Sequence, residues 1–287
     1  MKTSEHATEY HIHISSDDKA LNFNFKELLH YRDLIVLLTK KTFILTYKQT
    51  ILGPAWIFLT PFLTSLMYMV VFGKIAGLST NGVPQLLFYL GGSAIWTYFS
   101  TSISKISKTF TDNANVFGKV YFPRLCVPIS TIITSLINFG VQMLMFLALW
   151  IYYIARGAVR PHYEAIPLIL VVLLELGVLG FACGIIVSSL TTKYHDLTML
   201  VTFGIQLWMY GTPVVYPLSQ LNPSGTLYKF IYFNPVTPAV EMFRYIFLGT
   251  GVIHFDNWCS SCIATVVLAL IGVRLFNKVE KNFMDTV

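Results

Sequence analysis

Residues 165–192 read AIPLILVVLLELGVLGFACGIIVSSLTT, with Glu175 as the one Asp, Glu, Lys or Arg in the run. A helix that crosses a bilayer needs about 20 mostly apolar residues. A charged side chain at the bilayer centre costs roughly 3 kcal/mol. The run is therefore long enough and apolar enough to be a membrane span.

Five further stretches have no charged side chain: residues 49–73, 75–104, 125–155, 197–228 and 257–273. The last is short, but it reaches spanning length if Arg274 extends its charge to the head groups. The whole chain is 55% hydrophobic and 12% charged, which leaves too little polar surface for a soluble domain. We therefore predict an all-α integral membrane protein with six transmembrane helices, near residues 54–73, 84–104, 125–154, 166–190, 197–213 and 256–275.

The basic residues lie mainly on one side of these spans. If the N-terminus is cytoplasmic, the inside segments hold 15 of the 20 lysines and arginines. This asymmetry follows the positive-inside rule. It predicts a multi-pass protein of the cytoplasmic (inner) membrane with both termini cytoplasmic. The net charge of +6 is explained by this topology, so we predict no nucleic-acid partner.

Residues 1–25 are predicted to be a disordered cytoplasmic tail, and residues 26–287 a single membrane domain. Between residues 26 and 52 apolar side chains recur every three or four positions among several lysines, as in an amphipathic helix. We predict that this helix lies in the cytoplasmic interface, with its lysines toward anionic head groups. A solvated helix packed on a partner is the alternative.

The segment 214–250 fits neither a loop nor a span, because it is apolar and yet interrupted by prolines. We predict two short re-entrant helices that dip into the outer half of the membrane and form a lid over the external end. Glu241 and Arg244 are three residues apart, so they are expected to pair on a helix. We expect this pair to face a water-filled side.

Three smaller features carry limited information. Gly180-x-x-x-Gly184 indicates close helix packing, and Glu175 is expected to hydrogen bond to a neighbouring span or to line a wet conduit. Cys259 and Cys262 have redox spacing at the start of a span, where small-residue packing is predicted and an extracytoplasmic disulfide is the alternative. No G-x-x-x-x-G-K-[ST] loop is present, so we predict no catalytic residue, no metal site and no cofactor bound by this chain.

Five pieces of sequence occur in a characteristic order: Tyr47-Lys-Gln-Thr-Ile-Leu-Gly-Pro-Ala-Trp56, residues 113–128 with Phe122-Pro-Arg124, Thr212-Pro-Val-Val-Tyr-Pro217, Asn234-Pro235 followed by Arg244, and Lys278-Val-Glu-Lys281. With them, the chain from Lys41 to its C-terminus resembles the permease subunit of type-2 ABC exporters for O-antigen, capsule or teichoic acid. One departure is His195-Asp196, where that family often has Arg-Asp.

The resemblance implies the permease half of an ATP-driven exporter that moves lipid-linked or nascent polysaccharide out of the cytoplasm. It implies two copies of this chain and two copies of a separate ATPase subunit, which binds ATP and Mg. Coupling to the ATPase is expected at the interfacial helix, at the first inside loop and at the turn 193–196. The loop is a candidate because Phe110, Val116 and Phe117 would otherwise be exposed to water; an ordinary solvated connector is the alternative for this loop. The expected coupling residues are Phe110, Asp112, Asn113, Val116, Phe117, Lys119, Lys193, His195 and Asp196.

Aromatic faces stack on sugar rings, so aromatic residues of the first, second and fifth spans and of the segment that follows the fifth are the candidate substrate path. They are Tyr68, Phe72, Phe88, Tyr89, Trp96, Phe99, Trp208, Tyr210 and Tyr216. Ordinary packing and interfacial belts would use the same residues. The phosphate end of a lipid-linked substrate, or membrane lipids themselves, would contact the inner-face cations Lys40, Lys41, Lys48 and Arg124.

Two other functions are compatible with a membrane protein of this kind. An ABC exporter of a small molecule or drug would share the spans but would lack the Leu-Gly-Pro-Ala-Trp entry. A membrane-embedded glycosyl or lipid transferase would need clustered acidic or histidine residues at one face. Only His195-Asp196 approaches such a cluster.

Overall fold

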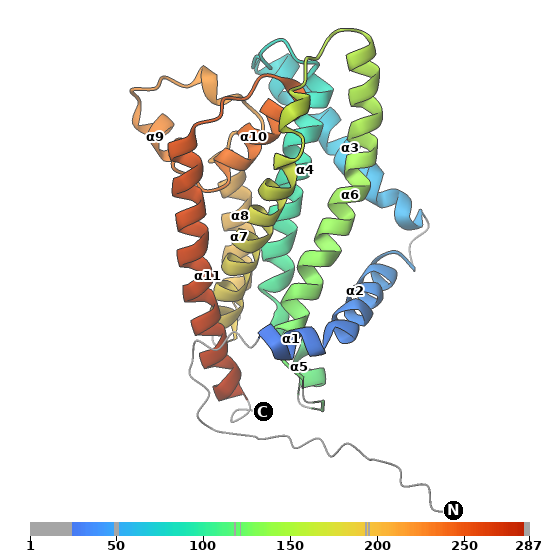
Figure 1. The fold of residues 1–287 in the computed structure, drawn as a ribbon, viewed down its shortest axis with the longest axis vertical. Helices are drawn as coiled ribbons and strands as arrows, with labels where there is room; N and C mark the ends of the chain where they lie inside the picture. The colour runs from blue at the N-terminus through green and yellow to red at the C-terminus, as the bar shows by residue number, and fades with distance from the viewer. Residues whose placement is uncertain are drawn as a thin grey trace, which may run out of the picture.

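The computed structural model describes residues 25–48, 52–117, 119–120, 122–192, 194 and 196–283. All regular elements within these residues are helical (Figure 1). They are α1 (Phe25–His30), α2 (Arg32–Tyr47), η1 (Gly53–Ala55), α3 (Trp56–Tyr68), η2 (Met69–Ile75), α4 (Gln85–Ile106), α5 (Thr109–Phe117), α6 (Cys126–Ala155), η3 (Tyr163–Ala165), α7 (Leu168–Thr191), α8 (Leu197–Tyr210), η4 (Leu218–Gln220), α9 (Thr226–Tyr232), α10 (Thr237–Leu248) and α11 (Phe255–Phe283).

Among the described residues, four segments are long and apolar enough to cross a membrane: Trp56–Ile75, Cys126–Ala155, Leu168–Thr191 and Phe255–Glu280. Helix α4 has 22 residues, but its second half is rich in serine and threonine. Helix α8 has only 14 residues. The prediction of an all-helical membrane protein is confirmed, and a helix occupies each of the six predicted positions. That α4 and α8 also cross the membrane stays a prediction.

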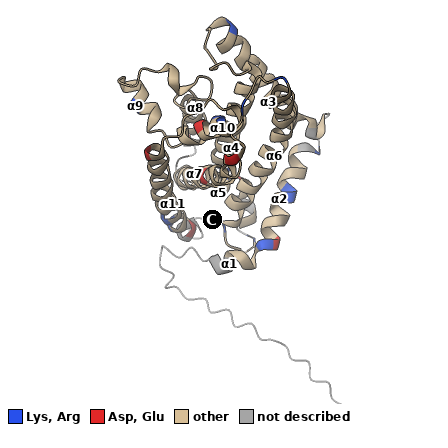
Figure 2. Cartoon of the chain, turned by 45° about the horizontal axis from the view of Figure 1, so that its top comes forward, with Lys and Arg blue, Asp and Glu red and all other residues tan. Residues whose placement is uncertain are grey.

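The long helices form a bundle around α4, which packs against α6 and α7, while α11 packs along α7. Helices α1 and α5 lie at one end together with the last turns of α11, at the bottom of Figure 1, and we call this the α5 end. Helices α9 and α10 lie at the opposite end, which we call the α10 end. Long parts of the bundle have no charged residue (Figure 2), as the apolar stretches predict.

Helices α7 and α4 approach each other closely because α7 has glycines on the contact face. A Cβ atom added at Gly184 would lie 2.6 Å from the Cβ atom of Ile106, and one at Gly180 would lie 3.2 Å from that of Ser102. A side chain at these positions would therefore push the two backbones apart. The predicted close packing at Gly180-x-x-x-Gly184 is found between these two helices.

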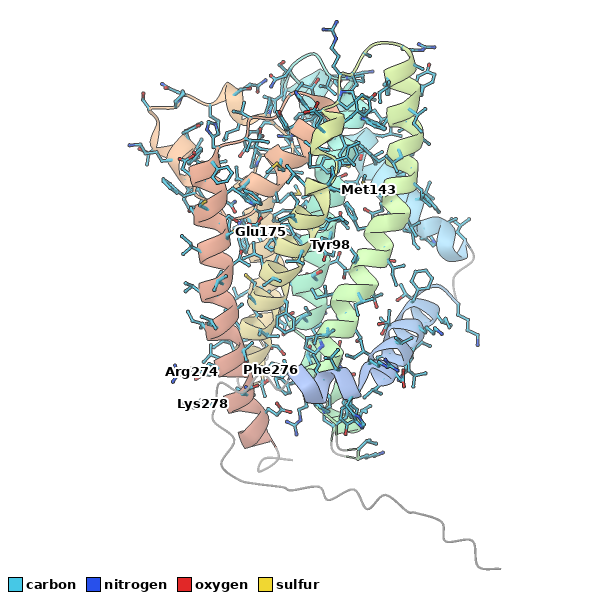
Figure 3. The ribbon with its side chains drawn as sticks, in the orientation of Figure 1. Tyr98, Met143, Glu175, Arg274, Phe276 and Lys278 are labelled. Atoms are coloured by element: carbon cyan, nitrogen blue, oxygen red, sulfur yellow. The ribbon has the colours of Figure 1, made fainter. Side chains whose placement is uncertain are left out.

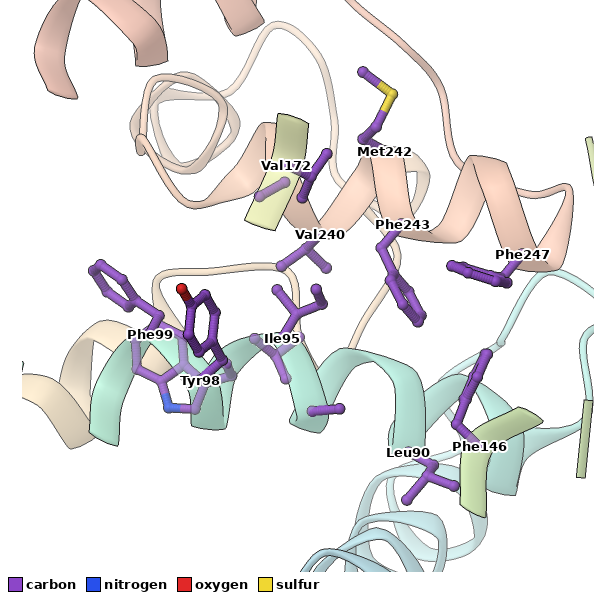
Figure 4. Close-up of a cluster of buried hydrophobic side chains, with 14 of the residues drawn as sticks. Leu90, Ile95, Tyr98, Phe99, Phe146, Val172, Val240, Met242, Phe243 and Phe247 are labelled. Atoms are coloured by element: carbon purple, nitrogen blue, oxygen red, sulfur yellow. The ribbon is translucent and has the colours of Figure 1, made fainter. Parts of the chain in front are cut away.

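The main hydrophobic core joins α4, α6, α7 and α10 and is shown in Figure 4. Phe146 on α6 lies 5.2 Å from Phe243 and 5.5 Å from Phe247, both on α10, between ring centroids. Gly91 on α4 makes room for these rings, since a Cβ atom there would lie 2.6 Å from Phe243. Helix α10 is thus part of the core and is buried along nearly its whole length.

Residues 26–52 were expected to form a helix, and within them the structure has α1 and α2, which are separated by a turn at Tyr31. Helix α2 packs on α6 and buries Ile35 and Thr39. Its exposed surface mixes lysines with large apolar side chains: Lys40, Lys41, Val36, Leu37, Ile44 and Leu45. That this helix lies in the cytoplasmic interface stays a prediction. Residues 1–24 of the predicted tail lie outside the described residues.

The two short helices expected within residues 214–250 correspond to α9 and α10. Helix α10 ends at Gly249, whose φ of 70° is left-handed and therefore favours glycine. Whether these helices re-enter a membrane stays a prediction. Cys259 and Cys262, at the start of α11, are both free thiols, so the alternative of a disulfide between them is not found.

Candidate functional site

Arg244 on α10 is the centre of the α10 end and is only 1% exposed. Its Nη1 donates to Glu241 Oε1 at 3.0 Å and to the carbonyl of Tyr216 at 3.2 Å, and its Nη2 donates to the carbonyl of Val214 at 2.9 Å. Its Cζ atom lies 4.0 Å from the ring centroid of Phe88. A buried charge is tolerated only with such partners. These contacts hold the turn after α8 between α4 and α10.

The pairing of Glu241 with Arg244 was expected, but its surroundings were not. We expected the pair to face water, and this is wrong because Glu241 is also buried, with 7% of its surface exposed. Two backbone carbonyls and an aromatic ring take the place of water around the guanidinium. These groups come from distant segments, so local spacing could not reveal them.

Asn234 holds the second part of the same turn. Its Oδ1 accepts hydrogen bonds from Trp208 Nε1 and from the Val236 amide, both at 3.1 Å. Its Nδ2 donates to the Gly211 carbonyl at 2.8 Å and to Thr212 Oγ1 at 2.9 Å. One amide side chain therefore ties the end of α8 to the start of α10, which gives a structural reason for the Asn234-Pro235 and Thr212-Pro213 motifs.

Five of the predicted substrate-path aromatics are at least partly exposed. We call them the aromatic wall: Tyr68, Phe72, Trp208, Tyr210 and Tyr216. The hydroxyl of Tyr68 donates to the sulfur of Met209 at 3.3 Å, and that of Tyr216 donates to the carbonyl of Tyr210 at 2.9 Å. The wall is therefore built from α3, η2, α8 and the following turn, and its rings are accessible to a ligand.

The other four predicted path residues, Phe88, Tyr89, Trp96 and Phe99, are all on α4 and buried. Phe99 contacts Trp208 edge-on with ring centroids 5.2 Å apart, and Tyr89 contacts Tyr68 at 6.3 Å. These α4 residues pack against the inner side of the aromatic wall, and their rings are not exposed. For these four, the packing alternative accounts for their positions.

The rings of the predicted coupling loop are covered within the chain itself. Phe110 is 1% exposed and lies 4.7 Å from Phe276 of α11 between ring centroids, and Phe117 is 4% exposed beside Phe122. The expectation that these two rings would otherwise be exposed to water is therefore wrong: Phe276 of α11 covers Phe110, and Phe110 and Phe122 cover Phe117. Val116 at 41% exposure, together with the exposed Asp112 and Lys119, remains available to a partner.

The second predicted coupling segment lies at the same end of the bundle. Asp196 is exposed, while Lys193 and His195 lie outside the described residues. Thr191 Oγ1 at the end of α7 donates to the Ser107 carbonyl before α5 at 2.9 Å. Within α5, the Asn113 side chain donates to the Thr109 carbonyl at 2.9 Å. The two segments are thus mechanically joined, and their role in coupling stays a prediction.

The predicted inner-face cations fall into two groups. Lys40, Lys41 and Lys48 are exposed and remain available to head groups. Arg124 is 5% exposed and donates through Nη1 to the Glu280 carbonyl at 3.0 Å. Arg124 therefore braces α11 and does not present the free cation that a head-group contact needs.

Glu175 lies along the bundle between its two ends (Figure 3) and is 6% exposed. Trp258 Nε1 donates to its Oε2 at 2.7 Å. Ser261 Oγ lies 2.6 Å from Glu175 Oε1 and also 2.6 Å from the Pro235 carbonyl. A hydroxyl has one hydrogen, so a neutral carboxyl or an amide at position 175 could donate to Ser261, which could then donate to Pro235. The cluster joins α7, α11 and the start of the α10 region.

Sequence reasoning pointed to Glu175 but not to its partners. Trp258 and Ser261 are three residues apart at the start of α11. This spacing places them on one face of the helix, and it was the signal in the sequence that could have identified them as partners of Glu175. An isolated carboxyl group in an apolar span requires such partners.

Comparisons with known proteins identify a transporter family and related permeases. The family model for the ABC-2 type transporter matches residues 33–248. An O-antigen export system permease protein RfbA from Myxococcus xanthus is 26% identical over 262 residues, which cover 91% of this chain and 98% of the relative. Two proteins of that name from Klebsiella pneumoniae are 26% and 24% identical, each over 88% of this chain and 94% of the relative.

Proposed function

The chain belongs to the ABC-2 type transporter family, and we propose that it is the permease half of an ATP-driven exporter of a cell-surface polysaccharide of the O-antigen class. The observation that carries the proposal is the extent of the match. Relatives named as O-antigen export permeases align with 88% or more of this chain and 94% or more of their own length. As a transport subunit of this family, the chain works with an ABC ATPase and is not itself the catalytic enzyme.

The topology that we propose has six spans, formed by α3 with η2, α4, α6, α7, α8 and α11. Helices α9 and α10 re-enter the outer half of the membrane, and both termini are on the cytoplasmic side of the inner membrane. Support comes from two groups of cations: Lys40, Lys41 and Lys48, on or just after α2, are exposed, and Arg274 and Lys278 lie on the last turns of α11, at the α5 end (Figure 3). Such a concentration is typical of the cytoplasmic face.

In the assembly that we propose, two copies of this chain and two ATPases move a lipid-linked polymer along the aromatic wall. The ATPases act on the α5 end, where α5 is packed against α11 through Phe110 and Phe276 and is joined to α7 through Ser107 and Thr191. Movement of α5 would therefore shift the long helices and not only a surface loop. The accessible rings of the wall suit the apolar faces of sugars while leaving the sugar hydroxyls hydrated.

Deletion of the gene from its own bacterium tests the function directly. We expect polysaccharide to disappear from the cell surface, as measured with a lectin, and lipid-linked polymer to accumulate inside the cell. Inactivation of the partner ATPase should give the same phenotype. Loss of surface polymer without internal accumulation would indicate a role in synthesis and would contradict the proposal. Unchanged surface polymer would also contradict it.

A further inference from the structure

Helix α4 has a polar stripe in its second half. Ser93, Thr97, Thr101 and Lys105 follow one another at intervals of four residues. This spacing places them on one side of the helix. From Lys105 to Ser93 the stripe rises about 18 Å, at 1.5 Å per residue. It therefore begins at the α5 end and extends well into the bundle.

Two neighbouring helices turn polar side chains toward this stripe. Thr60 and Thr64 of α3, four residues apart, and Ser135 and Gln142 of α6, seven apart, line the same cavity as the α4 stripe. The cavity has a volume of about 300 Å³, which lies within the usual range for small-ligand sites. A space lined by so many hydroxyl and amide groups is unusual inside an apolar bundle.

Some of these polar groups have no partner. Gln142 and Ser135 are 7% and 2% exposed, and within the described residues Gln142 Oε1 and Ser135 Oγ have no hydrogen-bond partner. Lys105 forms no ion pair with a carboxylate of the described chain, and the cavity lining contains no Asp or Glu. Buried polar groups without partners cost free energy, so this arrangement favours a polar guest.

The chemistry of the lining indicates the kind of guest. One ammonium group in a lining that also carries serine and threonine hydroxyls suits a phosphate, and the free acceptor of Gln142 suits a hydroxyl group. Helix α3 also has exposed apolar side chains: Trp56, which lines the cavity, is 42% exposed, and Phe58 and Leu63 are 37% and 51% exposed. An apolar chain attached to the guest could lie against them in the lipid.

We propose that this cavity between α3, α4 and α6 binds the head group of a lipid in which a phosphate is joined to a hydroxylated group. Lys105 and the threonines of α4 bind the phosphate, and Gln142 accepts a hydrogen bond from a hydroxyl. Such a head group could belong to a membrane phospholipid or to a polyprenyl-linked sugar. The binding site is argued from the cavity alone and does not rest on the proposed function. Only the identification of the head group as that of a polyprenyl-linked sugar rests on that function.

Lipid binding to the full chain in complex with its ATPase, in phosphatidylcholine nanodiscs, tests the proposal. The probes are spin-labelled phosphatidylglycerol and a spin-labelled polyprenyl phosphosugar. Lys105→Gln should weaken binding of at least one probe by at least about tenfold, because a hydrogen bond to a charged group is lost. Lys105→Arg should retain binding. Lys108→Gln is the matched control, since Lys108 is exposed and outside the cavity lining.

A second variant guards against a folding defect. Thr101→Val changes little volume and should also weaken binding, with an unchanged melting temperature. Binding of both probes that is equal in Lys105→Gln and Lys108→Gln, with Thr101→Val also unchanged, would overturn the site. Preference for the phosphosugar would identify the site with the exported lipid. Preference for phosphatidylglycerol would identify a membrane-lipid site, and it would support the cavity even if the polysaccharide function failed.

Discussion

The two ends of the bundle each contain a buried arginine, but the arginines are held differently. At the α10 end, Arg244 lies 3.0 Å from the carboxylate of Glu241 on its own helix. At the α5 end, Arg124, in the turn before α6, lies 3.9 Å from the carboxylate of Glu280 on α11. The side chain of Glu241 is 9% exposed, whereas that of Glu280 is 32% exposed and retains access to water. The α10 end is thus closed by a desolvated ion pair and the α5 end by a hydrated one.

This difference indicates which end can move. A desolvated pair with further carbonyl and ring contacts has no favourable alternative arrangement, so we expect the α10 end to behave as one rigid unit. A longer pair at the edge of water can be broken and remade at small cost. We therefore expect conformational change driven by an ATPase to begin at the α5 end, and four substitutions test this contrast.

Arg244→Met should have the largest effect. It leaves Glu241 buried without its cation, which costs about 3–5 kcal/mol. We expect loss of monodisperse protein, as measured by size-exclusion chromatography of detergent extracts. The double variant Arg244→Met, Glu241→Leu should recover much of the loss, because it removes both charges. Normal stability of the single variant would contradict a closed α10 end.

Glu175→Leu should have the next largest effect. It leaves the Trp258 indole N–H without its acceptor, at a cost of about 1–3 kcal/mol. The Ser261 hydroxyl loses its contact with Glu175 but keeps the Pro235 carbonyl as an acceptor. Glu175→Gln is the control, because an amide can accept from Trp258 and donate to Ser261. The melting temperature of the Gln variant should therefore be close to that of the wild type, and that of the Leu variant should be well below it. Equally large losses with Gln and with Leu would show that the negative charge is required, and a Leu variant as stable as the wild type would contradict the hydrogen-bonding role.

Arg124→Met should cost less than Arg244→Met, about 1.5 kcal/mol, because a charged hydrogen bond is lost while Glu280 remains partly hydrated. Thermal unfolding of the two variants side by side measures the contrast between the ends. Equal losses would remove the distinction on which the account is built.

Val116→Lys should have the smallest effect on stability, within about 0.5 kcal/mol for an exposed site, and yet it should abolish coupling. We expect the purified chain to lose its ATPase partner in a pull-down assay. The control is Tyr163→Lys at the α10 end, which is 58% exposed and should retain the partner. Retention of the ATPase by both variants would exclude docking through this face of α5.

Much of the architecture could be predicted because a long run of apolar residues is enough to identify a membrane span. The apolar stretches predicted helices where the structure has them, and the prolines after Gly211 predicted the division into α9 and α10. The environment of Arg244 and the covering of Phe110 by Phe276 depend on segments far apart in the sequence, so no local pattern could indicate them.

The polar cavity is a different case, because the sequence contains a pattern that indicates it. Ser93, Thr97, Thr101 and Lys105 recur at helical spacing, but a search of the spans for charged residues alone does not detect a stripe of hydroxyl groups. The aromatic candidates show the opposite limitation. Residue type did not separate the accessible Tyr210 from the buried Phe99, since only the packing of α4 distinguishes them.

Transport in proteoliposomes tests the central claim most directly. The chain and its ATPase are reconstituted with lipid-linked polysaccharide in the outer leaflet, ATP is added outside, and a glycosidase is enclosed within. The account predicts ATP-dependent digestion of the polymer and stimulation of the ATPase by the polymer. Polymer that remains undigested with ATP, in vesicles whose ATPase is active but indifferent to it, would contradict the assignment as a polysaccharide permease.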